Sequence, residues 1–198
     1  MNLYEYQGKQ LFSRYSIPVP DGYVVDNKDK LKKFEHPVVV KSQILLGGRG
    51  KSGGIKFARK ADELVPAVNE LLGSKIRDYT VKQLLVEQML DIKKEYYVSI
   101  ALNRADRAPV MIASPSGGVE IETVPDDKIF RKNIDPLLGY SAFLGKEAGS
   151  FMGFDKDLAG QFSRILQQMY RLFIEYDCEL VEINPLVPEE GIVIHNNL

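Results

Sequence analysis

The amino-acid sequence predicts a mixed α+β fold, and three features of the chain lead to this prediction. Short runs rich in Val, Ile and Tyr, joined by short polar connections, are typical of antiparallel strands. Apolar residues at helical spacing in the 155–176 segment are typical of a long amphipathic helix packed on a core. A glycine-rich basic stretch at 47–54 separates two strand-like segments, so it predicts a hairpin with a flexible loop.

The composition is that of a globular chain. With 198 residues, the chain is long enough for one or two domains with a substantial core. Hydrophobic residues make up 44% of the sequence and charged residues 27%, which excludes the disordered class. A net charge of -1 excludes a general attraction to nucleic acid or to membrane surfaces.

The cysteine content suits a reducing compartment, and the apolar runs predict neither a membrane span nor a signal peptide. Cys178 is the single cysteine, so an internal disulfide is excluded. No apolar run is long enough to span a membrane, and the first residues lack the apolar core of a signal peptide. We therefore expect a cytoplasmic chain, or one in the mitochondrial matrix if the source is eukaryotic.

Helix caps, turn residues and strand formers divide the first part of the chain. An amphipathic helix carrying Leu11 and Phe12 is expected to end at the Pro- and Gly-containing turn 17–22. Pro66 is placed in the first turn of its helix, and Gly73 is the stop. The expected elements are a helix capped by Asn2, a strand at 23–26, a Lys-rich helix capped by Asn27 and ending at Phe34, a strand at 38–43 and a helix at 61–72.

The second part of the chain predicts a sheet followed by helices and a final hairpin. Strands are expected at 84–89, 96–103, 109–114 and 119–124, with antiparallel pairing because their connections are short. Helices are expected at 135–149 and 155–176, and a closing hairpin at 180–187 and 191–194. The apolar stripe of the 155–176 helix is interpreted as core and not as a cofactor site.

The 36–61 segment is the first candidate for a functional site. It contains six Lys or Arg and no Asp or Glu, and five glycines fall within positions 47–54. Glycines let the backbone approach a ligand closely, and the cations attract anions, so the stretch predicts a phosphate-covering loop. A solvated loop with incidental charge is the alternative. The P-loop and dinucleotide fingerprints do not fit, because no helix-forming segment follows the glycines.

Carboxylates and an amide beside predicted strands form further candidates. Glu87 and Glu95 flank a strand–turn–strand junction, where a carboxylate can accept hydrogen bonds from an amine or from ribose hydroxyls. Glu182 and Asn184 lie two residues apart, and such hard oxygen ligands suit magnesium. Solvated glutamates are the alternative for the first pair. The turn at 114–122, with glycines followed by alternating acids, is also explained by a plain hairpin turn.

Seven motifs, in the same order and spacing, resemble the ATP-grasp part of the β subunits of the succinyl-CoA synthetase family (ADP-forming succinate–CoA ligases). The motifs are Asn2-Leu3-Tyr4-Glu5-Tyr6-Gln7, Val40-Lys41-Ser42-Gln43, Gly47-Gly48-Arg49-Gly50-Lys51-Ser52-Gly53-Gly54, Leu85-Val86-Glu87, Asp91-Ile92-Lys93-Lys94-Glu95, Gly117-Gly118-Val119-Glu120-Ile121-Glu122 and Val181-Glu182-Ile183-Asn184-Pro185-Leu186-Val187. The resemblance implies an ATP-grasp fold with a nucleotide cleft between two sheets. It implies a lid subdomain at about 20–110, and a larger subdomain formed by 1–19 and 111–198.

The resemblance also implies residue roles and a reaction. ATP would contact Lys41, Gly48, Arg49, Gly50, Glu87, Leu90 and Glu95, and Mg²⁺ would be ligated by Asn184 and Asn196. No catalytic residue is expected in this chain, because the phosphorylated histidine of the family lies on the partner α subunit. With that subunit, the implied reaction converts succinate, CoA and ATP reversibly to succinyl-CoA, ADP and phosphate.

The sequence departs from the family pattern in two places. The family continues into a second, CoA-ligase domain, which is absent from these 198 residues. The family also has an aspartate on the closing strand as a second magnesium ligand, where this chain offers His195 or Asn196, neither bringing a negative charge. Two alternatives therefore stand beside the main reading: a truncated nucleotide-binding module without turnover, and another ATP-grasp acyl-CoA ligase. We expect this polypeptide alone to bind ATP–Mg weakly and to make no succinyl-CoA.

Overall fold

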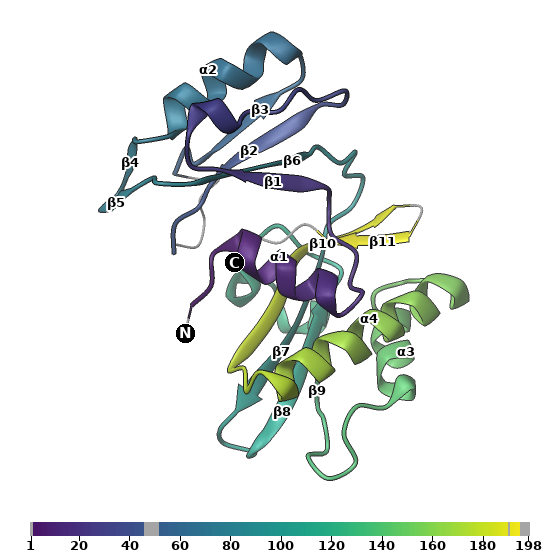
Figure 1. Ribbon diagram of the computed structural model, residues 1–198. Coiled ribbons are helices and arrows are strands. Elements are labelled where there is room, and N and C mark those ends of the chain that lie inside the picture. Colours follow the sequence, from purple (N-terminus) through teal and green to yellow (C-terminus); the bar gives the residue numbers. More distant parts are fainter. Residues whose placement is uncertain (1, 46–51, 190, 195–198) are drawn as a thin grey trace. The chain divides into compact units, whose positions relative to one another are not determined.

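The computed structural model describes residues 2–45, 52–189 and 191–194, and the description that follows concerns these residues. They form two compact units, each described by itself (Figure 1). Of the described residues, unit 1 contains 2–9, 20–45 and 52–91, and unit 2 contains 10–19, 92–189 and 191–194. Within the described residues, no helix is both long and apolar enough to cross a membrane.

Unit 1 is built on an antiparallel sheet with one helix on its face. In the described residues the strand order is β1-β6-β2-β3. Helix α2 covers one face of this sheet (Figure 1). A short two-stranded ribbon, β4 (Lys75–Ile76) with β5 (Tyr79–Thr80), follows α2. The bounds are β1 Gly22–Val25, β2 Val38–Ser42, β3 Ile55–Ala58, β6 Leu84–Gln88 and α2 Ala61–Leu71.

Strand register decides which side chains of this sheet face α2. Val40 and Val86 lie opposite each other and belong to the core with α2. Side chains alternate between the two faces of a strand, so Lys41 and Glu87 lie on the other face. Lys41 pairs with Leu85, and Glu87 pairs with Val39. The alternation therefore brings the lysine and the glutamate to the same side of the sheet.

Unit 2 is a second antiparallel sheet packed against helices. In the described residues its strand order is β11-β10-β7-β8-β9. Helices α3 and α4 follow each other in sequence and pack together, and α4 also packs against the sheet. The core is formed by residues such as Val98, Met111, Phe162 and Ile183. The bounds are β7 Tyr96–Asn103, β8 Ala108–Ser114, β9 Phe130–Asn133, β10 Leu180–Glu189, β11 Gly191–Ile194, α3 Ala142–Phe151 and α4 Lys156–Glu175.

Helix α4 confirms the prediction for the 155–176 segment. Asp155 caps it, since its side chain accepts a hydrogen bond from the Leu158 backbone N–H at 2.8 Å. The predicted apolar stripe is buried in the unit 2 core, where Phe162, Leu166 and Met169 lie. The helix ends before Asp177, whose φ of 49° cannot continue it.

The first helix, α1 (Glu5–Arg14), begins later than its sequence predicts. The predicted cap, Asn2, lies three residues before the first helical residue and is not the N-cap. Instead, the Tyr4 backbone N–H donates to the Gln7 side-chain oxygen at 2.9 Å. Phe12 is buried in the core of unit 2, as its apolar character predicts.

Two predicted helices are shorter than expected. Between Asn27 and Phe34 only a 3-10 turn, η1 (Lys28–Lys30), forms, although Asn27 does cap it by accepting from the Asp29 N–H. This 3-10 turn buries no side chain, so packing does not favour a longer helix. The helix predicted at 135–149 begins later, as α3 (Ala142–Phe151), and Ser141 is its N-cap. The chain turns before it at Gly139, which has a φ of 72°.

The predicted strand at 119–124 is wrong. The segment forms a 3-10 turn, η2 (Ile121–Thr123), despite its alternating pattern. The Glu120 carbonyl accepts from both the backbone N–H and the hydroxyl of Thr123, at 2.9 and 2.7 Å. These local bonds use backbone groups that a sheet would need. A second 3-10 turn, η3 (Asp126–Lys128), follows, and the strand that pairs with β8 is β9.

The observed units also divide the chain at a different place from the sequence-based estimate. The sequence placed 20–110 in the lid, whereas the compact units change after Asp91. The reason is that β7 pairs with β8 and β10, so its residues belong to unit 2. The remaining predicted strands are found within one or two residues, with β10 and β11 as the closing hairpin. The helix at 61–72 is also confirmed, although Pro66 lies beyond its first turn.

Helices α3 and α4 approach closely at Gly145, which leads to a testable prediction. A Cβ at position 145 would lie 2.9 Å from the Ser163 Cα and 2.0 Å from the Tyr140 hydroxyl oxygen. Replacing Gly145 with alanine is therefore expected to lower the free energy of unfolding by about 1–3 kcal/mol, as overpacking does. Urea denaturation followed by circular dichroism measures this change.

The control is Gly160→Ala on α4, where no heavy atom lies within 4 Å of the added Cβ. This variant is expected to be neutral or to gain about 0.5–1 kcal/mol, because alanine favours the helix more than glycine does. Similar effects of the two substitutions would contradict the close approach at Gly145.

Candidate functional site

A cluster of four charged side chains is buried in unit 1. The Lys9 ammonium lies 3.0 Å from the Glu5 carboxylate, and the Lys41 ammonium lies 3.1 Å from the same Glu5 oxygen. Both ammonium groups also pair with the Glu87 carboxylate. Glu5, Lys9, Lys41 and Glu87 expose only 1%, 5%, 0% and 1% of their surfaces. We refer to these four residues as the charge quartet.

The charge quartet is formed by one helix, α1, and two neighbouring strands, β2 and β6. Glu5 and Lys9 are four residues apart on α1, so they lie on one face of that helix. Lys41 and Glu87 come from neighbouring strands, β2 and β6, on the face away from α2. Beside them, Gly22 has no room for a side chain, because an added Cβ would lie 2.8 Å from the Glu87 Cβ. Glycine at this position therefore lets β1 pass beside Glu87.

The pairing of opposite charges makes this burial possible. An isolated ion is very costly to bury, whereas ions that pair with good geometry offset much of that cost. Burial lowers the pKa of Lys41 despite its carboxylate neighbours. Burial also acts to lower the pKa of Lys9, but attraction by Glu5 and Glu87 outweighs it, and that pKa is raised. Removing one member of such a cluster typically costs about 3–5 kcal/mol.

A second group of polar residues lies in unit 2, around the turn at Gly117 and Gly118. The Gly118 N–H donates to the Asn184 side-chain oxygen at 2.7 Å, and the Asn184 amide nitrogen donates to the Val119 carbonyl at 3.0 Å. The Gly117 N–H donates to the Glu95 carbonyl at 2.9 Å. Both ends of the Asn184 amide are thus held by the turn.

Glycine is required at both positions of this turn. A Cβ at Gly117 would lie 2.2 Å from the Tyr96 carbonyl oxygen, and a Cβ at Gly118 would lie 2.0 Å from a Glu95 carboxylate oxygen. Gly118 also has a φ of 69°, which L residues adopt at a cost. The turn therefore places Glu95 and Asn184 near each other through contact with the same two glycines.

The donor set around Asn184 fits a hard cation. An amide oxygen has two lone pairs, so Asn184 can accept from Gly118 and still offer a ligand. Mg²⁺ prefers such oxygen ligands and keeps several waters. Among the described residues, no cluster of three or more His, Cys, Asp or Glu is arranged to hold a metal ion. Asn184 therefore suits a magnesium ion that is bound mainly by water and phosphate.

Glu182, two residues before Asn184, is held by a tyrosine. Its carboxylate accepts a hydrogen bond from the Tyr97 hydroxyl at 2.8 Å, and the Ser99 hydroxyl lies 3.0 Å from the same tyrosine oxygen. Burial raises the pKa of Glu182, the Tyr97 hydrogen bond opposes that shift, and the charge of Glu122 adds to it. Burial and the charge of Glu182 also raise the pKa of Tyr97.

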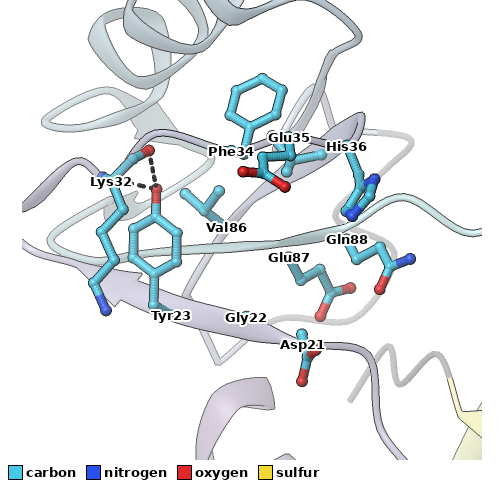
Figure 2. Close-up of a pocket in the computed structure, with 11 residues that line it drawn as sticks. Asp21, Gly22, Tyr23, Lys32, Phe34, Glu35, His36, Val86, Glu87 and Gln88 are labelled. Atoms are coloured by element: carbon cyan, nitrogen blue, oxygen red, sulfur yellow. Dashed lines mark hydrogen bonds between the residues drawn. The ribbon is translucent and has the colours of Figure 1, made fainter.

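Unit 1 also contains an open cavity of about 380 Å³ near the charge quartet (Figure 2). Tyr23 and Lys32 lie on one side of it, and His36 and Gln88 lie on the other. The Tyr23 hydroxyl donates to the Lys32 carbonyl at 3.2 Å, and the Lys32 ammonium lies 5.2 Å from the Tyr23 ring centre. Asp21 and Glu35 bring two negative charges to its lining and Lys32 one positive charge, a balance that does not favour a triphosphate.

The structure brings together some of the residues predicted from the sequence. Lys41 and Glu87 meet in the charge quartet, and Glu95 and Asn184 each contact the glycine turn. Leu90 is partly buried just after β6. Gly48, Arg49, Gly50 and Asn196 lie outside the described residues. The strands that flank the glycine loop do form a hairpin, since β2 pairs antiparallel with β3.

Sequence reasoning missed Glu5 and Lys9. Both lie in the first ten residues, and only Glu5 entered a motif, as part of the resemblance. A Glu–Lys pair four residues apart is usually a solvent-exposed pair on a helix. The available signal was their spacing to Phe12, because positions 5, 9 and 12 follow the i, i+4, i+7 pattern of one helix face and Phe12 is apolar.

Comparison with known proteins defines the class of this chain. Residues 2–188 match the family model described as an ATP-grasp domain. The chain therefore belongs to the ATP-grasp family, and the predicted ATP-grasp fold is confirmed. The predicted relationship is confirmed as well, because curated β subunits of ADP-forming succinate–CoA ligase are similar to this chain along nearly its whole length.

The β subunit from Desulfurococcus amylolyticus is 40% identical, with 94% of this chain and 51% of the relative covered. The β subunit from Ignicoccus hospitalis is 39% identical, with 98% of this chain and 54% of the relative covered. The β subunit from Bacillus subtilis is 39% identical, with 94% and 52% covered. The chain thus spans about half the length of the curated relatives that it matches.

Solved structures share the fold at low identity. A dinucleotide-forming acetyl-coenzyme A synthetase 1 from Ca. Korarchaeum cryptofilum, in complex with coenzyme A and Ca-AMPCP, has a TM-score of 0.78 at 18% identity, covering 98% of this chain and 91% of that one. ATP citrate lyase from Methanothrix soehngenii has a TM-score of 0.74 at 22% identity, covering 98% and 49%. At these identities the likeness concerns the fold alone.

The role of the glycine turn can be tested with Gly118→Ala. The positive φ at 118 predicts a loss of about 1–2 kcal/mol in the free energy of unfolding. The added Cβ would also displace the Glu95 carboxylate, and we expect the side-chain amide signals of Asn184 to shift in NMR spectra.

Gly153→Ala is the matched control, because Gly153 has a φ of 78° and no heavy atom within 4 Å of the added Cβ. It should cost a similar amount of stability and leave the Asn184 signals in place. Unchanged Asn184 signals in Gly118→Ala would contradict the coupling between the turn and Asn184.

The pKa of Glu182 leads to a pH-dependent prediction. Glu122→Gln removes a repulsive charge, so the pKa of Glu182 should fall, whereas Tyr97→Phe removes a hydrogen bond that lowers it, so the pKa should rise. Carbon-13 NMR titration of the side-chain carboxyl measures both shifts. Shifts in the same direction would contradict these contacts.

The raised pKa of Glu182 also has a consequence for stability. The folded state holds this proton more tightly than the unfolded state, whose pKa is near the ordinary value of 4.5. The resulting stabilisation is complete below that value and is lost as the pH rises through the raised folded-state pKa. Glu182→Gln should remove this part of the pH dependence in denaturation experiments.

Proposed function

We propose that this chain is the nucleotide-binding part of a β subunit of ADP-forming succinate–CoA ligase. The observation that carries the proposal is the identity of about 40% to such subunits over 94% of the chain. The whole reaction would require an α subunit as partner and would take place in the cytoplasm. It would convert succinate, CoA and ATP reversibly to succinyl-CoA, ADP and phosphate.

The proposed chemistry is phosphoryl transfer between ATP and a histidine of the partner α subunit. Succinyl phosphate would then form, and coenzyme A would displace the phosphate to give the thioester. Such transfers depend on positioning the reactants and on offsetting phosphate charge, and they need little covalent chemistry from the nucleotide-binding chain. This accords with the expectation that this chain supplies binding residues and no nucleophile.

The predicted binding residues would contact different parts of the nucleotide. Lys41 would meet the nucleotide phosphates, and Gly48, Arg49 and Gly50 would cover them. Glu87, near the end of β6, would lie by the adenine, Leu90 just after that strand would contact the nucleotide, and Glu95 would lie by the ribose or phosphates. The quartet supports this assignment because it holds the Lys41 ammonium in one place.

Magnesium would be held by Asn184, with Asn196 as the second predicted ligand. The bound ion would neutralise part of the phosphate charge. The anchoring of Asn184 by Gly118 and Val119 supports its part, because a fixed amide loses little freedom on binding the ion.

A nucleotide-binding module without turnover is the second candidate. The observation that favours it is the sequence at 194–198, which offers neutral His195 and Asn196 where the resemblance expects an aspartate. A neutral ligand should lower the affinity for magnesium. Mixing the chain with an α subunit and assaying thioester formation separates the two candidates. Succinyl-CoA formation would exclude the module without turnover.

Calorimetric titration of the chain with ATP, with and without Mg²⁺, tests nucleotide binding. We expect weak binding that magnesium strengthens. Asn184→Leu should reduce the affinity for ATP–Mg about tenfold, or ~1.4 kcal/mol, and should leave the magnesium-free affinity unchanged. Asn133→Leu, at an exposed asparagine of β9, is the control and should bind as the unmodified chain does. Absence of any nucleotide binding would refute the proposal.

A further inference from the structure

An open cavity of about 740 Å³ lies in unit 2 at the start of α4, beside the neighbouring helix α3. Its lining contains three cations, Lys146 from α3 and Lys156 and Arg164 from α4, together with two acids, Asp155 and Asp157. We propose that this cavity binds a small phosphate-bearing anion. The proposal goes beyond the proposed function, because none of these residues belongs to the predicted nucleotide or magnesium site.

The close packing of α3 against α4 brings the cations of both helices to one cavity. A Cβ at Gly149 would lie 2.9 Å from the Ala159 Cβ, so only glycine lets the two helices approach this closely. Lys156, Gly160 and Arg164 follow one another at intervals of four residues and lie on one face of α4. A Cβ at Gly160 would meet no heavy atom within 4 Å, so the space between the two cations of this face is open.

The three cations form no ion pair or side-chain hydrogen bond with any part of the chain that the structure describes. Ion pairs within a helix join residues three or four positions apart. At those positions in its own helix, each of the three cations has only Gly, Ala, Ser, Phe or Gln. By contrast, Arg171 on α4 pairs with Glu175 at 3.4 Å. Like charges that line one cavity repel one another, and a bound anion offsets this repulsion.

The two acids of the lining are explained by the start of α4. The Asp155 carboxylate accepts from the Leu158 backbone N–H at 2.8 Å, and Asp157 lies in the first turn, where the helix dipole favours negative charge. The same dipole disfavours a cation, so helix stability does not account for Lys156 at the first helical position. With three cations and two acids, the lining keeps a net charge of +1.

The lining suits a phosphate group attached to a carbon skeleton. Arg164 can donate two parallel hydrogen bonds to phosphate oxygens, and the two lysines act as point charges. Gln161 and Ser150 add neutral hydrogen-bonding groups. Phe154 and Ala159, which belong to the unit 2 core, give the cavity an apolar wall. The volume falls within the range of about 300–1,000 Å³ that is typical of small-molecule sites.

The cavity and the magnesium candidate Asn184 lie on opposite sides of the unit 2 sheet. Ile183 belongs to the same core as Phe162 and Leu166 of α4. Successive residues of a strand point to opposite faces, so Asn184 points away from the helices. A ligand of the cavity therefore does not contact Asn184, and the two sites can be tested separately.

NMR titration of the nitrogen-15-labelled chain with sodium pyrophosphate tests the site. We expect the backbone amide signals of Gly160 and Gln161 to shift in a saturable way, and sodium chloride at equal ionic strength to leave them in place. Lys146→Gln and Arg164→Gln should each weaken pyrophosphate binding at least about fivefold. Lys128→Gln, which removes an exposed cation of η3 in the same unit, is the control and should bind as the unmodified chain does.

Gly160→Leu distinguishes a cavity from diffuse positive charge. This variant keeps all three cations and places its side chain in open space, so it should fold and should bind pyrophosphate about tenfold more weakly. Diffuse attraction would leave binding to Gly160→Leu unchanged, or would make Lys128→Gln lose as much affinity as Arg164→Gln. Either result overturns the proposal, as does the absence of a saturable shift at Gly160. If Gly160→Leu does not fold, the comparison of Arg164→Gln with Lys128→Gln decides alone.

Titration of Arg164→Gln with ATP–Mg separates this proposal from the proposed function. The variant should bind ATP–Mg as the unmodified chain does. Equal losses of affinity for pyrophosphate and for ATP–Mg would assign both to one site and would overturn the proposal. A chain that shows the saturable shift at Gly160 but binds no ATP–Mg would refute the proposed function and would support the cavity as an independent site.

Discussion

The burial of paired charges is the constraint on which unit 1 depends. Lys41 lies in a strand whose five residues are all buried, where a lysine without partners would be very costly. Its ammonium is acceptable there because Glu87 comes from the next strand and Glu5 from α1. The same three elements must therefore keep their register and orientation for the unit to fold. A site for anions can use this constraint, since it fixes a cation in place.

Unit 2 fixes its polar residues by a different device. There the constraint is steric: Gly117 and Gly118 bring a turn so close to Tyr96 and Glu95 that a side chain would collide. The close approach lets the turn bind Asn184 by both ends of its amide. One unit thus positions a candidate phosphate contact by charge pairing, and the other positions a candidate metal ligand by backbone hydrogen bonds.

Local sequence patterns predicted helices and strands correctly where the apolar residues of the pattern are buried in a core. The apolar stripe and Asp155 cap predicted α4, and the β-branched runs predicted β2, β7 and β10. They failed where a local pattern had no partner to pack against. The Lys-rich segment after Asn27 buries nothing and forms a single turn, and the alternating residues 119–124 use their backbone groups in a turn. Strand β9, with three exposed residues of four, carries little periodic signal.

The sequence by itself determined the family, the order of most elements and the candidate residues Lys41, Glu87, Glu95 and Asn184, because motif spacing and apolar periodicity are properties of the chain alone. Only the tertiary structure decided which charges meet. Glu5 and Glu87 are 82 positions apart in the sequence. Glu5 and Lys9 are four positions apart on one helix, a spacing that is typical of solvent-exposed ion pairs. Their burial beside Lys41 results from strand pairing and helix packing, which bring together residues that no local pattern connects.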